Sequence, residues 1–273
     1  MCDTLEVQTF VLPKSPSTGR KVVQGRDGTS FNSAAQKPML ITTLPSFRSD
    51  ANIQKLVDKL RGKTICIEGN IGVGKTKFIE NCKAVLSNHI NITCLGESID
   101  TEMLKKFNEN PRKYSSMFQE VMKIGRLKNA DAMEGLKSQG DSVIFIDTGI
   151  VREIAFSAAN FSMEYMSEAY FKAHMQTFQQ VLLDIGHPVP DYIILLDASG
   201  DRCMENIKKR SRSNESLLEK KYLDSLTREH RNALQHELIK GKCVTQIVGV
   251  EHNYATDIIN ILSNLVKTDV NHD

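Results

Sequence analysis

Hydrophobic residues gather in five short runs that predict buried strands. Each run is rich in Ile, Val and Leu, and its apolar residues occupy neighbouring positions instead of alternating with polar ones. A strand covered by helices on both faces has this pattern. The predicted strands are Thr64 to Glu68, Ile90 to Leu95, Val143 to Asp147, Tyr192 to Asp197, and Val244 to Val250.

Amphipathic patterns with helical spacing separate the strands. Strands that alternate with helices predict a parallel sheet with right-handed crossovers. We therefore predict an α/β protein, a three-layer α/β/α fold with a five-stranded parallel sheet. The predicted helices begin at Asp50, run from Lys75 to Leu86, begin near Pro111, run from Met163 to Ile185, begin at Ser216, and run from Ala255 to Val266.

The first 49 residues differ from the rest of the chain. They contain Ser-Pro, Thr-Gly, Asp-Gly and Lys-Pro steps and show no sustained periodicity. Such a segment cannot bury enough apolar surface to offset its conformational entropy. We predict a disordered leader over residues 1–49 and one folded domain over residues 50–273.

Composition and charge narrow the function classes. The formal net charge of +2 gives no reason to expect a nucleic acid partner. No apolar run reaches the roughly 18 residues that a membrane helix requires, so we expect no membrane partner. The six cysteines are scattered and form no C-x-x-C pair, which is typical of reduced thiols. We predict a cytoplasmic or nuclear protein.

A phosphate-binding loop is the strongest chemical signal. The segment GNIGVGKT fits G-x-x-x-x-G-K-[ST], follows a predicted strand and opens a predicted helix. Glycines let backbone N–H groups turn towards phosphates, and the helix N-terminus favours the same negative charge. Lys75 is expected to reach the outer phosphates of ATP, and the Thr76 hydroxyl is expected to ligate Mg²⁺. The loop residues are Gly69, Asn70, Ile71, Gly72, Val73, Gly74, Lys75 and Thr76.

The loop alone does not say which reaction follows. The predicted strand that ends at Asp197 continues as Ala-Ser-Gly, which disfavours the guanine-binding N-K-x-D segment of signalling GTPases. The chain is also short for a motor or a helicase. A small kinase is the remaining class.

Further segments, in order along the chain, resemble the deoxynucleoside kinase family. They are ICIEGNIGVGKT, CLGESID, NPRKYSSMFQEVMKIGR, YIILLD, the R-x-R-x-x-E segment at 210–215, and VGVEHNY, and together they span most of residues 63–266. The resemblance implies phosphorylation of nucleosides at the 5′-hydroxyl by ATP in nucleotide salvage. It also implies an arginine-rich lid, an adenine-contacting loop at VGVEHNY and a homodimer.

The same resemblance implies roles for individual residues. Glu97 would be the general base, and Asp147 would replace the family's acidic residue for the metal. Phe118 would stack on the nucleobase, with Gln119 and Arg126 beside it. Lid residues Arg210 and Arg212 would meet the transferred phosphate, and Glu215 would hold the sugar 3′-hydroxyl.

Four positions depart from the family pattern. Thr148 stands where the family has an arginine, Val151 at the inferred position of the base-recognising aspartate, Asn108 for a tyrosine, and Asn206 for a lid arginine. Arg152 and Glu153 lie beside Val151, and a shift of the alignment would restore Arg152 as a phosphate ligand. These departures leave open a nucleotide-binding scaffold without catalysis. A nucleoside monophosphate kinase of the thymidylate type is a second alternative, because its fold is related.

Overall fold

The structure is a computed structural model that describes residues 50–97, 99–186, 188–212, 215, 217–250 and 257–269. The predicted leader, residues 1–49, lies outside this part of the chain. So do Ser216, where one helix was expected to begin, and residues 251–254 of the VGVEHNY segment.

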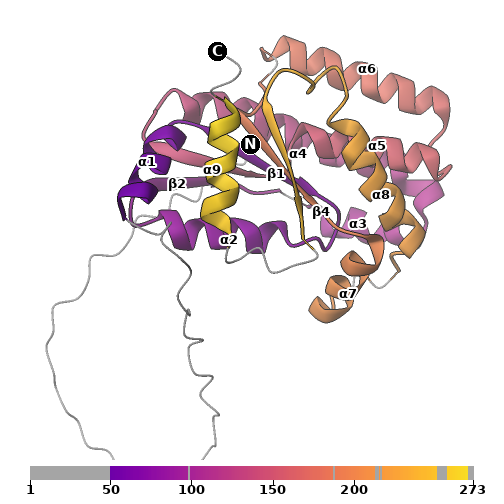
Figure 1. Cartoon of the computed structure of the whole chain (residues 1–273). Coiled ribbons are helices and arrows are strands. Elements are labelled where there is room, and N and C mark those ends of the chain that lie inside the picture. The colour runs from indigo at the N-terminus through magenta and orange to yellow at the C-terminus, as the bar shows by residue number, and fades with distance from the viewer. Residues whose placement is uncertain are drawn as a thin grey trace, which may run out of the picture.

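Five parallel strands form one sheet in the order β2-β3-β1-β4-β5. In this order β1 lies at the centre, so the loop that follows it emerges from the middle of the sheet (Figure 1). The strands are β1 (Thr64–Gly69), β2 (Asn91–Leu95), β3 (Ser142–Asp147), β4 (Tyr192–Asp197) and β5 (Val244–Gly249).

Helices cover both faces of the sheet. On one face α2 packs on β1 and β3, α9 packs on β5, and α1 packs on α9. On the other face α4 contacts β3, α5 contacts β1, and α8 contacts β1 and β4, while α6 lies outside α4 and α5 (Figure 1). The helices are α1 (Asp50–Leu60), α2 (Lys75–Leu86), α3 (Thr101–Glu109), α4 (Pro111–Lys137), α5 (Ile150–Ser162), α6 (Glu168–Asp184), α7 (Gly200–Arg210), α8 (Lys220–Ala233) and α9 (Ile258–Asp269).

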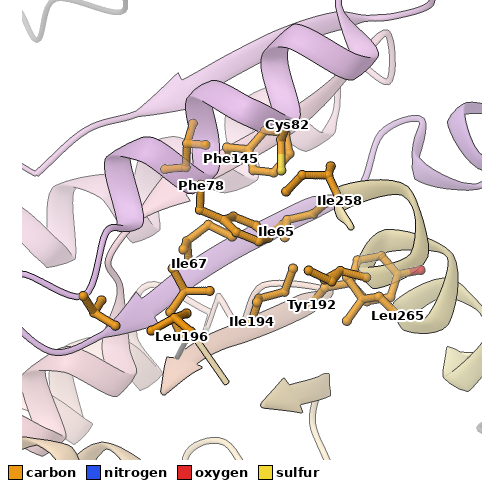
Figure 2. Packing of buried hydrophobic residues seen from close by; sticks show 14 of the residues in the cluster. Ile65, Ile67, Phe78, Cys82, Phe145, Tyr192, Ile194, Leu196, Ile258 and Leu265 are labelled. Atoms are coloured by element: carbon orange, nitrogen blue, oxygen red, sulfur yellow. The ribbon is translucent and has the colours of Figure 1, made fainter. Parts of the chain in front are cut away.

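Alternate residues of the central strands β1, β3 and β4 point into two separate cores. Ile65 and Ile67 of β1 belong to the core under α2 and α9, together with Phe78 (Figure 2). Cys66, between them, belongs to the opposite core with Ile154 of α5. Both faces of the central strands are buried, which explains why their sequences are continuously apolar.

The predicted three-layer fold with its five-stranded parallel sheet is confirmed, and helix α2 has its predicted limits. The helix expected from Met163 to Ile185 is shorter, because α6 begins at Glu168 with the Ser167 side chain accepting from the N–H of Tyr170. Before it, Glu164 adopts a left-handed backbone with φ 57°. This turn separates α6 from α5, which the sequence did not predict.

The helices were also compared with the requirements for crossing a membrane. Across the described ranges, none of them combines the length and the apolar character required to cross a bilayer.

Candidate active site

The phosphate loop leaves the centre of the sheet at β1 and enters α2. Three glycines of the loop have positive φ values, a conformation that residues with a Cβ atom rarely adopt. The values are 139° at Gly69, 78° at Gly72 and 105° at Gly74. A Cβ on Gly72 would lie 2.7 Å from the carbonyl oxygen of Cys203 in α7. Glycine at this position therefore permits both the curve of the loop and its close contact with α7.

Asn70 fixes the loop from inside. Its Nδ2 donates to the carbonyl oxygen of Leu223 at 2.7 Å and to Oγ1 of Thr227 at 2.8 Å, and its Oδ1 accepts from the N–H of Ile71. From the other side, Nδ2 of Asn206 donates to the carbonyl oxygen of Gly72 at 2.9 Å. The loop is thus tied to α7 and α8.

The Lys75 ammonium folds back over the loop. Its Nζ donates to the carbonyl oxygens of Gly69 at 2.8 Å and Asn70 at 3.0 Å. Burial, and then repulsion from Arg152, lower the pKa of Lys75 to about 8, against the attraction of Asp147. This cation therefore lies close to another cation, where an anion would be stabilised.

Two residues that the sequence proposed for Mg²⁺, Thr76 and Asp147, lie near this lysine. Thr76 is exposed in the first turn of α2, and Asp147 is half-buried at the carboxyl end of β3. The charge of Asp147 acts on Lys75, so these groups are near one another. A hydroxyl and a carboxylate are hard oxygen donors, and Mg²⁺ commonly takes few protein ligands besides phosphate oxygens and water. This donor set fits the ion.

Glu97 follows β2 and is held by two guanidinium groups. Its Oε1 lies 3.2 Å from Nη2 of Arg126, and its Oε2 lies 3.2 Å from Nη1 of Arg152. Burial raises the pKa of Glu97, but Arg152, Arg126 and then Lys75 outweigh burial and hold the pKa below its usual value. Glu97 is therefore a carboxylate over a wide pH range.

Arg126 connects Glu97 to a second buried carboxylate. Its Nη1 donates to Oε2 of Glu153, whose side chain is fully buried. Glu153 Oε1 also lies 2.5 Å from Nε2 of His174 in α6. Burial raises the pKa of Glu153, but Arg126 and His174 outweigh it, so this pKa is also lowered.

A small pocket opens beside Glu97 and Arg126. Its volume is about 50 Å³, below the roughly 300 Å³ at which ligand pockets begin. A ligand of ordinary size would fit in this pocket only if the lining residues separated. The lining residues are Ile71, Ile99, Leu104, Phe107, Asn108, Phe118, Met122, Arg126, Arg152, Phe156, Glu215 and Leu218.

The three residues that the sequence proposed for the nucleobase are on α4, and two of them, Phe118 and Arg126, line this pocket. The ring of Phe118 stacks on Phe107 with centroids 5.0 Å apart and lines the pocket. Gln119 is fully buried, and its Nε2 donates to Oγ of Ser157 at 3.0 Å. Within the described residues its Oε1 has no hydrogen-bond partner. The amide therefore retains capacity for a ligand.

The residues proposed for the lid and the sugar contact each other. Nε and Nη2 of Arg210 donate to the two carboxylate oxygens of Glu215 at 2.7 and 2.5 Å. Arg212 is more remote, with Nη1 3.9 Å from Oε1 of Glu215. The structure brings Glu215 to the pocket and leaves Arg212 mostly exposed, so the arginine-rich lid remains a prediction.

The departures from the family pattern are resolved in part by α5. Thr148 is buried at φ 73°, and Val151 lies in the core instead of facing the pocket. The acid beside Arg126 is Glu153, and the arginine beside Glu97 is Arg152. Arg152 lies after Thr148, the position that the resemblance assigned to the arginine, and Glu153 lies after Val151, the position assigned to the aspartate. The start of α5 determines which residues point back to the edge of the sheet.

The sequence offered Arg152 only as a phosphate ligand under a shifted alignment, and it did not indicate Glu153 or His174 as parts of the site. Charged residues in an otherwise apolar helix were the available signal: α5 buries nearly every residue from Ile150 to Phe156, including Arg152 and Glu153. Buried charges need partners, and these are on α4, α6 and the loop after β2.

Comparisons with known proteins identify the family to which this chain is similar. The family model for deoxynucleoside kinase matches residues 65–269. The deoxyadenosine kinase of Dictyostelium discoideum is 27% identical over 201 residues, covering 72% of this chain and 74% of that protein. The deoxycytidine kinase of Homo sapiens is 25% identical over 219 residues, covering 72% and 84%.

A solved structure supports the fold independently. The deoxyadenosine kinase from M. mycoides with bound dATP superposes with a TM-score of 0.63 at 20% identity, covering 74% of this chain and 98% of that one. The family model covers most of the present chain, from β1 to the end of α9. This chain is a member of the deoxynucleoside kinase family.

Proposed function

We propose that the protein transfers the γ-phosphoryl group of ATP to the 5′-hydroxyl of a deoxynucleoside. Family membership supports this reaction, and the relatives it matches are deoxyadenosine, deoxycytidine and deoxyguanosine kinases. In the reaction the bond from the γ-phosphorus to ADP breaks, a bond to the 5′-oxygen forms, and the hydroxyl proton leaves to a base.

The position of Glu97 between the guanidinium groups of Arg126 and Arg152 is the observation that carries the proposal. Its carboxylate stands between the phosphate loop and the pocket, and three cations act on its pKa. A carboxylate beside the acceptor oxygen orients the hydroxyl and accepts its proton as the transfer proceeds. The low pKa keeps Glu97 ready as an acceptor at neutral pH.

The phosphate loop would hold ATP through backbone N–H groups and Lys75. The Lys75 ammonium now bonds two loop carbonyls, and phosphate oxygens are stronger acceptors for the same protons. Thr76 and Asp147 would hold Mg²⁺, which neutralises phosphate charge when bound. Arg210 and Arg212 would supply further positive charge.

The pocket would receive the nucleoside. Phe118 offers an aromatic face, while Gln119 and Arg126 offer polar groups for the base edge. The Glu215 carboxylate would accept a hydrogen bond from the sugar 3′-hydroxyl. The bond from Arg210 to Glu215 joins the proposed phosphate and sugar residues, so substrate entry would free Arg210 to turn towards the phosphates.

Substitution of Glu97 by Gln tests this assignment. The amide keeps the size of the side chain and removes its charge, so we expect kcat/KM for the preferred nucleoside to fall by about 10²- to 10⁴-fold. Affinity for ATP should change by less than about threefold. Steady-state kinetics with a panel of deoxynucleosides and Mg-ATP measures both quantities.

Arg112→Gln is the matched control, because Arg112 is exposed. Among the described residues it forms an ion pair with Glu164, also exposed, at 3.3 Å. Its kinetics should equal those of the wild type. Unchanged turnover in Glu97→Gln would exclude Glu97 as the base. ATP binding by the wild type without turnover of any nucleoside would favour a non-catalytic scaffold, and faster turnover of dTMP than of thymidine would favour a monophosphate kinase.

A further inference from the structure

Arg152 is a buried arginine to which the sequence gave no established role. It lies in the first turn of α5, is 9% exposed, and its guanidinium rests over the ring of Phe156 at 4.5 Å. Its Nη1 contacts Glu97, while its Nε has no hydrogen-bond partner within the described part of the chain. A buried donor without a partner is costly unless a ligand completes it.

The fold directs this side chain to the phosphate loop. Side chains of a helix lean towards its N-terminus, and the N-terminus of α5 stands at the carboxyl edge of β3, next to β1. Glu68, the residue before the loop, secures this start: its Oε1 accepts from the N–H of Gly149 at 2.8 Å and from that of Arg152 at 3.4 Å.

Arg152 lies beside the phosphate loop, because Arg152 and Ile71 of that loop line the same pocket. Lys75, a second cation, lies four residues after Ile71 in the same loop. Two like charges held close in a partly buried site are unfavourable until an anion lies between them. The Glu97 carboxylate offsets part of this repulsion, and the γ-phosphoryl group of ATP would offset more.

We propose that Arg152 is a catalytic residue that contacts the γ-phosphoryl group of bound ATP and, through Glu97, aligns it with the acceptor hydroxyl. The inference rests on the proposed function. Arg152 thereby supplies, from one turn inside α5, the positive charge that Thr148 cannot supply at the end of β3. The transfer itself keeps the balance given above: the proton goes to Glu97, and Arg152 remains protonated.

Nucleotide binding distinguishes this role from a structural one. In Arg152→Gln, we expect the affinity for a non-hydrolysable ATP analogue with Mg²⁺ to fall by about tenfold or more, with ADP affinity within about twofold of the wild type. Arg152→Lys keeps the charge and should recover part of the loss. Calorimetric titration measures these affinities without any turnover.

Kinetics gives the second readout. Arg152→Gln should lower kcat by about 10²- to 10³-fold and shift the acidic limb of the pH–rate profile upward, because Glu97 loses the cation that most lowers its pKa. Arg112→Gln should behave as the wild type in both assays.

Three outcomes would overturn the inference while the wild type still phosphorylates nucleosides. They are equal affinity of Arg152→Gln and wild type for the ATP analogue, an equal loss for the analogue and ADP, and a wild-type kcat. A wild type that turns over no nucleoside would instead refute the proposed function, while the titrations would still decide whether Arg152 meets the γ-phosphoryl group.

Discussion

Close backbone contact sets the residue identities in the phosphate loop. Gly72 lies against α7, where an added Cβ would meet the Cys203 carbonyl oxygen at 2.7 Å and Cγ1 of Ile207 at 2.8 Å. Its φ of 78° adds a second constraint. Gly72 occupies a variable position of the G-x-x-x-x-G-K-[ST] motif, so the motif does not require glycine here, and the structure supplies the packing reason.

Gly72→Ala should therefore weaken both the fold and ATP binding. We expect a loss of about 1–3 kcal/mol in the free energy of unfolding, because alanine is strained at positive φ and meets α7. Gly135→Ala is the control: Gly135 is exposed within α4, with no atom near an added Cβ, and alanine there should stabilise the helix by about 0.5–1 kcal/mol. Urea unfolding measures the free energy of unfolding of both variants. Equal changes in Gly72→Ala and Gly135→Ala would contradict the packing role of Gly72.

The residue roles could be proposed from motifs, but their partners could not. Glu97, Gln119 and Arg126 stand at positions that the sequence singled out, and the structure places Arg126 in the pocket lining with Glu97 against its guanidinium. Glu153 was missed because a shift of two residues along a helix changes the direction of a side chain by more than half a turn. Only the observed start of α5 fixes that direction.

At the scale of elements, a buried ionic network joins three helices behind the pocket. His174 of α6 lies between Glu153 of α5 and Glu120 of α4, with Nδ1 2.8 Å from Oε1 of Glu120. Lys123 and Tyr170 also contact Glu120, at 2.7 Å each. The network holds Glu153, and through it Arg126, in a fixed position.

His174 should stabilise the fold most at low pH. Burial lowers its pKa, but hydrogen bonding and attraction from Glu153 outweigh burial, so the pKa is raised in the folded protein. A raised folded pKa contributes stability fully below the unfolded pKa of about 6.5, and that stability is lost as pH rises through the folded value.

His174→Ala should therefore lower the free energy of unfolding by about 3 kcal/mol or more at pH 6, because it leaves Glu153 and Glu120 without their shared cation. The loss should be smaller at pH about 9, where wild-type His174 is closer to neutral. Denaturant unfolding at both pH values measures the difference. A cost independent of pH would mean that His174 contributes by packing alone.

At the scale of the whole molecule, the parallel sheet gathers the site at one edge. The ends of β1, β2 and β3 deliver the phosphate loop, Glu97 and Asp147, while residues of α3, α4 and α5 line the pocket. Runs of apolar residues were sufficient to predict the sheet, since strands buried on both faces are continuously hydrophobic. They were insufficient to predict α5, because this helix buries most of its residues, polar ones included, and so lacks a clear division into an apolar and a polar face.

Product analysis of the complete reaction tests the central claim most directly. The protein is incubated with ATP, Mg²⁺ and a deoxynucleoside, and the products are identified by ³¹P NMR with and without EDTA. The account predicts equimolar ADP and deoxynucleoside 5′-monophosphate, formed only when the metal is available. Absence of any 5′-monophosphate across a panel of deoxynucleosides, from protein that binds ATP, would contradict it.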